Sequence, residues 1–519
     1  MASQDQQLTE YERRRLENIK RNDEMMASLK IQSRLSELSA VSKSSREEKN
    51  KTKTYKRSSE KKPNSESAPI VIRRSLRARG MPPDSSGLPQ DFDESPAKKR
   101  SKMMMKTPTK KAEGLFIRGP LTMSDAYEGD DSYRPFIEKF TGLARMDDQN
   151  SSDGKRRSLR IRSNSSMNVN DHGSDISHSS PVKFERSTLE DPIDLGSLRL
   201  ESENIARVVP GRITVVRFFP TRDMKIVVAA NKFGNLGFWD LNAEGGEQGG
   251  NGIHLFQPHS APVSGICVHP FSLSKMYTSC YGGLLRLMDI EKEMFELVYS
   301  SDSGSALFSL SQQLNNVNSI YFGEGQGDLN LFDGRVGKIC SSWSLHDWRI
   351  NSIDFSPAAT NLMATSSTDG LACIWDLRKM DVKQPKSKVL QTLNHKRAVH
   401  SAYFSPSGNC LATTSVDDSI GVLQGANFED KFMIHHDNWT NRWLSSFRAV
   451  WGWDDTYLYV GNMKRRVDVV SVSQRKTVYA LESPLMSAIP CRYDAHPCVV
   501  GMLAGATSGG QVYVWTSSS

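Results

Sequence analysis

Short runs of alternating apolar and polar side chains recur along residues 205–519. Examples are Ile353-Asp354-Phe355 and the run from Leu371 to Trp375. A period of two is what half-buried β-strands require. The turns between these runs contain Pro and Gly where the chain must reverse, as in Ser356–Asn361 and Ser405–Asn409. The pattern predicts an all-β region built from many short strands.

One pattern of three strands repeats seven times in this region. Counted from Trp239, the aligned ends of the third strands are 49, 44, 43, 48, 46 and 46 residues apart. The ends are GFWD (Gly237–Asp240), RLMD (Arg286–Asp289), NLFD (Asn330–Asp333), CIWD (Cys373–Asp376), GVLQ (Gly421–Gln424), VDVV (Val467–Val470) and VYVW (Val512–Trp515). Repeats of this length are typical of propeller blades. We therefore predict a seven-bladed WD-repeat β-propeller with blades at 211–241, 259–292, 304–336, 346–379, 395–425, 435–473 and 481–519.

The first 200 residues have a different composition. They contain 39 Lys and Arg against 30 Asp and Glu, whereas residues 201–519 contain 28 against 29, so the basic surplus lies entirely in this part. It is rich in Ser, Lys, Arg and Pro and has few aromatics, so it buries too little apolar surface to offset chain entropy. We predict a long, mostly disordered basic region at 36–204, with the propeller at 205–519.

One helix is expected at the start of the chain. Thr9 to Glu12 fits a capping box, and the apolar residues from Leu8 to Leu29 recur near helical spacing. This predicts a short helix at about 9–30, within a segment 1–35. It is either a solvated helix that is marginal alone or a helix that docks on a partner or on the propeller.

Several classes of protein are disfavoured. No apolar run is long enough to span a membrane and the polar start lacks a secretory signal, which predicts a soluble intracellular protein. Cys491, His496 and Cys498 could form part of a metal site, but the missing fourth ligand favours ordinary buried thiols. The glycines of 323–327 favour a turn over a phosphate loop, and His435-His436-Asp437 favours a structural hydrogen bond. We expect no enzyme, no cofactor and no small-molecule substrate.

Basic motifs in the linker indicate a nuclear protein. Arg73–Arg79 and Arg156–Arg162 nearly repeat each other and suit salt-dependent binding of phosphates, or kinase recognition of Ser75 and Ser158. Lys98–Lys102 is typical of a nuclear import signal. Ser95-Pro96, Thr107-Pro108 and Ser180-Pro181 are candidate sites of proline-directed phosphorylation.

The chain resembles the WD repeat-containing protein 76 family, whose fungal members are described as damage-binding WD-repeat proteins. The stretch LTEYERRRLENIKRNDEMMASL (Leu8–Leu29) and the propeller carry this resemblance. The propeller is also similar to that of DNA damage-binding protein 2, through blade endings such as TSSTDGLACIWDLR. The resemblance implies a nuclear protein that binds DNA on one face of the propeller and can attach to a cullin-RING ubiquitin ligase adaptor. Chromatin proteins are further expected partners.

Candidate DNA-binding residues lie in loops that should meet on that face. Asn441-Arg442-Trp443 occupies the place of a hairpin that wedges into the duplex in the damage-binding relative, although the wedge residues differ in type, which puts lesion recognition in doubt. For Trp443 the alternative is packing between blades, and for each basic residue it is a solvated loop. The candidates are Arg212, Arg349, Lys396, Arg397, Asn441, Arg442, Trp443, Lys464, Arg465 and Arg466.

A second candidate surface comes from Trp375-Asp376-Leu377-Arg378. It matches the WDxR box through which many propellers dock on a cullin-RING ubiquitin ligase adaptor, with Asp369 at the expected upstream turn. Trp-Asp also closes any WD blade, so the match has a purely structural alternative. Two functions follow: a nuclear DNA-binding protein of the damage response and genome maintenance, or a ligase substrate receptor or scaffold whose propeller binds protein.

Overall fold

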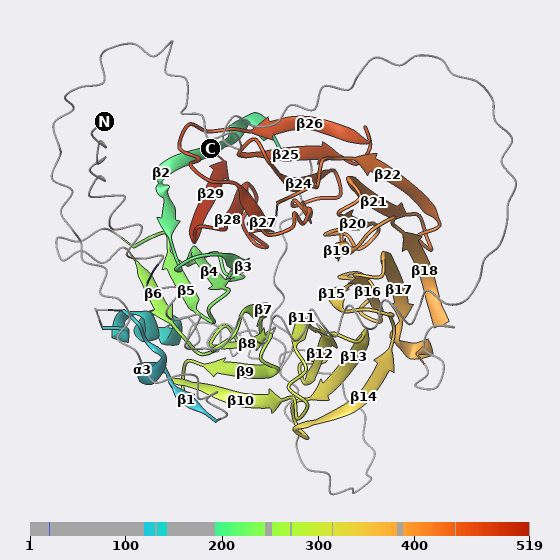
Figure 1. The fold of residues 1–519 in the computed structure, drawn as a ribbon. Coiled ribbons are helices and arrows are strands. Elements are labelled where there is room, and N and C mark those ends of the chain that lie inside the picture. Colours follow the sequence, from blue (N-terminus) through green and yellow to red (C-terminus); the bar gives the residue numbers. More distant parts are fainter. Residues whose placement is uncertain are drawn as a thin grey trace, which may run out of the picture. The chain divides into compact units, whose positions relative to one another are not determined.

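Seven antiparallel sheets form a ring around a central channel (Figure 1). The computed structural model describes residues 20, 119–129, 132–142, 193–243, 252–269, 272–313, 315–380, 388–441 and 443–517. The predicted helix at 9–30 falls outside these residues except for Lys20, as do the basic and phosphorylation motifs of the linker. The seven-bladed WD-repeat propeller predicted from the repeat is confirmed.

Blades one to three each contain four consecutive strands. Blade one has β3 (Ile213–Phe218), β4 (Ile226–Asn231), β5 (Leu236–Asp240) and β6 (Ile253–Phe256). Blade two has β7 (Val263–Val268), β8 (Lys275–Cys280), β9 (Leu284–Asp289) and β10 (Met294–Ser300). Blade three has β11 (Leu307–Gln312), β12 (Ser319–Glu324), β13 (Asp328–Asp333) and β14 (Lys338–Ser344).

Blades four to six follow the same order. Blade four has β15 (Ile350–Phe355), β16 (Leu362–Ser367), β17 (Leu371–Asp376) and β18 (Val389–Asn394), with the short helix η4 (Leu377–Lys379) after β17. Blade five has β19 (Val399–Phe404), β20 (Leu411–Ser415), β21 (Ser419–Gln424) and β22 (Asp430–His435). Blade six has β23 (Val450–Trp451), β24 (Tyr457–Asn462), β25 (Arg466–Ser471) and β26 (Lys476–Leu481).

Blade seven is completed by a strand from the other end of the domain. It contains β27 (Pro490–Ala495), β28 (Met502–Thr507) and β29 (Gln511–Ser517), and its outer strand is β2 (Leu198–Arg207), preceded by η3 (Leu195–Ser197). Backbone pairs such as Ile205 with Tyr513 join the two ends of the ring. The propeller therefore begins before the predicted boundary at 205, because β2 is part of its last blade.

Part of the predicted linker is folded onto blades one and two, which corrects the expectation for 36–204. β1 (Leu121–Thr122) adds a fifth strand to blade two by pairing with β10, and α3 (Met123–Ala126) follows it. Residues 134–142 form a further helix. Apolar side chains of both helices lie in one core with blades one and two, among them Phe136 and Phe140. Burial of these aromatics stabilises the segment despite its polar surroundings.

The glycine-rich run at 323–327 ends β12 and forms the turn that leads into β13, as the sequence favoured. Gly327 has a φ of 87°, and a Cβ there would lie 2.1 Å from the carbonyl oxygen of His346. A side chain is therefore excluded both by the left-handed backbone and by the neighbouring chain. None of the helices among the described residues is long and apolar enough to cross a membrane.

Candidate functional site

The strand order of each blade brings a defined set of loops to one end of the ring. The innermost strand starts at this end, and the turn between the second and third strands returns to it. We call this end the top face. Arg212, Arg349, Lys396 and Arg397 lie just before the innermost strands, and Lys464 and Arg465 lie in the turn between β24 and β25. The loops that carry the predicted basic residues thus share one face.

These basic residues differ in what they already contact. Lys396, Arg397, Lys464 and Arg465 are exposed. Arg466, in contrast, is only 29% exposed, and its guanidinium lies 2.9 Å from the Asp468 carboxylate and 3.2 Å from that of Glu482. These carboxylates compete with any outside anion, so Arg466 is the weakest of the basic candidates.

Two arginines of the set donate hydrogen bonds to neutral groups. Arg349 donates a hydrogen bond from Nε to the Thr368 hydroxyl at 3.1 Å, and its guanidinium lies 5.1 Å from the centre of the Phe308 ring. Arg212 donates from Nη2 to the carbonyl oxygen of Trp443 at 2.6 Å. Neutral contacts orient a guanidinium without cancelling its charge.

Trp443 projects from the loop that precedes blade six. Its backbone N–H donates to the Asn441 side-chain oxygen at 2.9 Å, and 69% of the residue is exposed. The alternative that Trp443 packs between blades is therefore wrong. Arg442 lies outside the described residues.

The top face also carries aromatic side chains that the sequence analysis did not single out. Trp348 and Trp439 precede the innermost strands of blades four and six and are 63% and 56% exposed. Phe233 and Tyr281 lie in the turns between the second and third strands of blades one and two and are 47% and 41% exposed. The sequence did contain a signal for these residues, because bulky aromatics occur there in Gly-rich or charged turns. Side chains in such turns do not pack into the core of a blade, so an aromatic residue there indicates a binding surface.

Buried hydrogen bonds fix the loops of this face. In blade four the His346 imidazole donates from Nδ1 to Asp369 at 2.9 Å and accepts at Nε2 from the Thr365 hydroxyl at 2.8 Å. That hydroxyl in turn accepts from the indole N–H of Trp375 at 2.8 Å. The chain of bonds links the entry loop to the second and third strands, so the loop position is set by the sheet beneath it.

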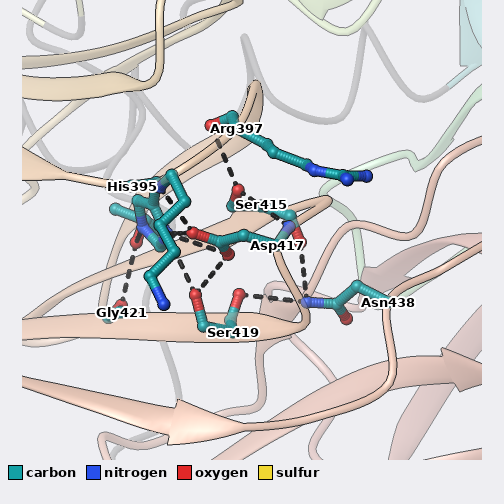
Figure 2. A network of polar contacts seen from close by, with 9 residues as sticks. His395, Arg397, Ser415, Asp417, Ser419, Gly421 and Asn438 are labelled. Atoms are coloured by element: carbon teal, nitrogen blue, oxygen red, sulfur yellow. Dashed lines mark hydrogen bonds and ion pairs between the residues drawn. The ribbon is translucent and has the colours of Figure 1, made fainter. Parts of the chain in front are cut away.

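Blade five repeats this arrangement without the indole. Figure 2 shows Asp417 between His395 and Ser419, with Arg397 on the adjoining loop, where its carbonyl oxygen accepts from Ser415. Asp417 Oδ2 also accepts from the backbone N–H of Lys396 at 2.8 Å. The two exposed cations Lys396 and Arg397 therefore stand on a fixed loop. In the next loop His436 is buried and shares a hydrogen bond with Asn438 at 2.8 Å, a structural role as expected.

Burial of histidines should make the fold sensitive to mild acid. Burial, and then the charge of Arg286, lower the pKa of His259 from 6.5 to about 3. Because the unfolded chain takes up this proton near pH 6.5 and the folded chain does not, stability falls as pH drops below 6.5. We expect a loss of about 2 kcal/mol from this residue between pH 7 and pH 5.

Denaturant unfolding of wild type and His259→Gln at both pH values measures this contribution. Gln retains a side chain that can bond the Thr278 hydroxyl, which lies 2.9 Å from His259 Nε2, but it does not titrate. The variant should lose less stability between pH 7 and pH 5 than wild type by that amount. Equal losses in the two proteins would show that His259 does not drive the acid response.

The residues predicted to dock a ligase adaptor do not form one surface. Arg378 follows β17 at the face opposite the top, where its side chain is 70% exposed and bonds Asp376 at 2.8 Å. This hydrogen bond lowers the pKa of the Asp376 carboxyl below its usual value. Trp375 and Asp376 are buried, and Asp369 lies at the other end of the blade against His346. Of these four residues, only Arg378 has a side chain that is well exposed to a partner protein.

Comparison with known proteins agrees with this architecture. The WD domain, G-beta repeat model matches residues 337–376 and 387–422. WD repeat-containing protein 76 of Xenopus laevis is 29% identical over 98% of this chain and 80% of its own length. DNA damage-binding protein CMR1 of Vanderwaltozyma polyspora is 26% identical over 99% of this chain and 98% of its own. WD repeat-containing protein 76 of Mus musculus is 27% identical over 98% of this chain and 74% of its own.

The similarity to these relatives runs through almost the entire chain, including the part before the propeller. The resemblance recognised in the sequence is thereby confirmed: the chain is a WD-repeat propeller protein that is similar over almost its whole length to WD repeat-containing protein 76 and DNA damage-binding protein CMR1.

Proposed function

We propose that this protein is a non-enzymatic, nuclear DNA-binding propeller that acts in the response to DNA damage. The observation that carries the proposal is the composition of the top face. Five exposed aromatic residues stand among exposed lysines and arginines on loops held by buried hydrogen bonds; the aromatics are Phe233, Tyr281, Trp348, Trp439 and Trp443. Several relatives bear the name DNA damage-binding protein CMR1, which supports the same function.

Each half of this combination contributes a different kind of contact. Cationic side chains such as Lys396 and Arg397 bind backbone phosphates and make the affinity depend on salt. Aromatic rings such as Trp348 and Trp443 stack on bases, which are accessible only where the duplex is open or distorted. The surface is therefore expected to prefer DNA with unpaired bases over an intact duplex, and damage produces such bases.

Binding of the full chain to a bubble-containing duplex and to the matched intact duplex tests the proposal. Trp348→Ala and Trp443→Ala should each weaken binding to the bubble by about 1–3 kcal/mol, the value of one aromatic–base stack. Binding to the intact duplex should change less, because its bases are not available. Fluorescence anisotropy at several salt concentrations measures both.

Tyr479→Ala is the matched control. Tyr479 is 41% exposed, as accessible as Tyr281, but it lies on the rim strand β26 and not on the top face. Its loss should leave DNA binding unchanged. Full affinity in both tryptophan variants would assign DNA binding to another part of the chain and leave the top face for protein recognition.

A further inference from the structure

A partly open cavity lies at the top end of the central channel. Its volume is about 310 Å³. The loop between β22 and β23 forms one wall, because Arg448 of this loop donates to the Asn351 carbonyl oxygen of blade four at 3.1 Å. On the far side Ser445 reaches the Ile213 carbonyl oxygen of blade one at 3.5 Å, and Arg492 of blade seven donates to the Ser446 carbonyl oxygen. The loop thus crosses the channel and is anchored on three blades.

The lining of this cavity is strongly cationic. Arg212, Lys232, Arg349, Arg448 and Arg492 all contribute to it, and no Asp or Glu is among the described residues that line it. In the part of the chain that the structure describes, Lys232, Arg349, Arg448 and Arg492 form no ion pair with a carboxylate. Positive charges drawn together without counter-charge repel one another, and an anion in the cavity would relieve that repulsion.

The two innermost arginines are held in place before any ligand arrives. Arg492 donates from Nε to the Thr214 carbonyl oxygen at 3.0 Å, and Arg448 donates from Nη1 to the Tyr403 hydroxyl at 3.3 Å. The Nε of Arg448 is buried without a hydrogen-bond partner among the described residues. These arginines are already fixed in position and still have N–H groups that can donate hydrogen bonds. An anionic ligand is therefore favoured, because its binding costs little side-chain entropy.

The electrostatic effects of these side chains overlap inside the cavity. Burial, followed by the charges of Arg448, Arg492 and Arg349, lowers the pKa of His400, another lining residue, to about 3. Burial and the charge of Arg448 lower the pKa of Arg492 to about 10. Burial disfavours a charge of either sign, but the part of these shifts that comes from the neighbouring arginines favours an anion by the same interactions.

The opposite end of the channel has the reverse character. A cavity of about 520 Å³ there is lined by Asp354, Asp454 and Asp455, and its arginine, Arg217, is paired with Asp494 at 2.8 Å. The charge of the channel therefore changes from positive at the top to negative at the bottom. Of the two ends, only the top favours an anion.

We propose that the top cavity binds a small soluble ligand that carries two or more phosphate groups. The volume corresponds to roughly ten water molecules, room for more than one phosphate, and lies at the lower end of the range for small-molecule pockets. Tyr281 and Phe308, whose rings are 4.9 Å apart, supply an apolar wall for the ligand scaffold. A DNA duplex, whose major groove alone is about 12 Å wide, is too large to enter.

Isothermal titration calorimetry on the full chain tests this site with pyrophosphate, myo-inositol hexakisphosphate and inorganic phosphate as probes. Both polyphosphates should bind more tightly than inorganic phosphate. Lys232→Gln and Arg349→Gln should each weaken polyphosphate binding about tenfold or more, the effect of losing one charge-assisted hydrogen bond. Lys476→Gln, which removes an exposed lysine from the rim strand β26, is the matched control and should bind as wild type does.

Two outcomes would overturn the proposal. One is the absence of binding by either polyphosphate at low salt, and the other is equal weakening by Lys476→Gln and Lys232→Gln, which would reveal only general attraction to a basic protein. Lys232 is exposed, so its substitution keeps the test valid even if Arg349→Gln perturbs the fold. DNA binding measured on the same samples separates the two proposals, since a wild-type protein that binds DNA but neither polyphosphate rejects this one alone.

Discussion

A chain that starts at residue 208 should unfold about 5 °C or more below a chain that starts at residue 193, since a strand's loss costs several kcal/mol. The shorter chain lacks β2, the outer strand of blade seven. It exposes the free edge of β29, together with the core that buried Leu198 shares with Trp515 and Tyr513. Differential scanning calorimetry of the two proteins gives the difference directly.

Both of these chains lack the segment at 119–142, so its contribution cancels in the comparison. A chain starting at 193 with Glu201→Ala, a change at an exposed position of β2, controls for the effect of altering this strand's sequence. Similar unfolding temperatures for chains starting at 193 and at 208 would mean that three strands suffice for the last blade and that closure by β2 adds little stability.

The second large effect is expected in the segment that packs on blades one and two, residues 119–129 and 132–142, which we call the docked segment. Phe140 is 1% exposed and lies 4.9 Å from Phe219, and Phe136 is 3% exposed and lies 4.9 Å from Phe238. Replacing a buried Phe with Ala costs about 3–5 kcal/mol. Phe140→Ala should therefore detach the segment for a much larger fraction of the time, while the blades below remain folded.

Limited trypsin digestion measures this detachment. Lys139 is bound to Asp240 of blade one in the docked state, and cleavage after it requires the helix to leave the blade. The rate in Phe140→Ala should rise by roughly a hundredfold or more, which corresponds to the lost packing free energy. Glu138→Ala, at an exposed position of the same helix, should cleave at the wild-type rate. Equal rates in both variants would show that these aromatics do not hold the segment.

The three inner strands of each blade were predictable from the sequence. Their side chains are either buried on both faces of the sheet or alternate strictly between apolar and polar. The outer strands were not predictable. β14 has the exposed sequence KICSSWS with Trp343 as its one buried residue, so its apolar signal is close to that of a loop. β2 was missed for a further reason: its partner β29 lies at the opposite end of the domain, and no local pattern can indicate a pairing over that separation.

The docked segment was missed because its surroundings dominate the composition. Tyr133, Phe136 and Phe140 form an aromatic group at near-helical spacing within a region that otherwise contains few aromatics. That group was the available signal. Composition averaged over a long stretch of polar sequence hides this aromatic group. In the structure, the three aromatic side chains pack together into the core of blades one and two.

The sequence was sufficient to predict which face of the propeller carries the candidate site. It was not sufficient to predict which side chains on that face are available to bind a ligand. Topology places entry loops together, so Arg349 and Lys396 could be assigned to one face from the repeat alone. The pairing of Arg466 with Asp468 depends on side-chain geometry within β25. The cavity depends on a loop that crosses the channel, and loop paths leave no periodic signal. Asp369 lies only six residues before Trp375 in the chain, but β17 runs from the top end, near Asp369, to the bottom end, where the backbone of Trp375 lies.

The closure of the ring by β2 has a consequence for synthesis of the protein. The strand that completes blade seven leaves the ribosome first among the propeller strands, and its partner β29 leaves last. Throughout translation the blades made so far form an open arc with an unpaired strand edge at each end, the situation that invites pairing with other chains. The ring can close only after β29 has left the ribosome, so a product truncated before β29 remains an open arc and a substrate for chaperones and proteases.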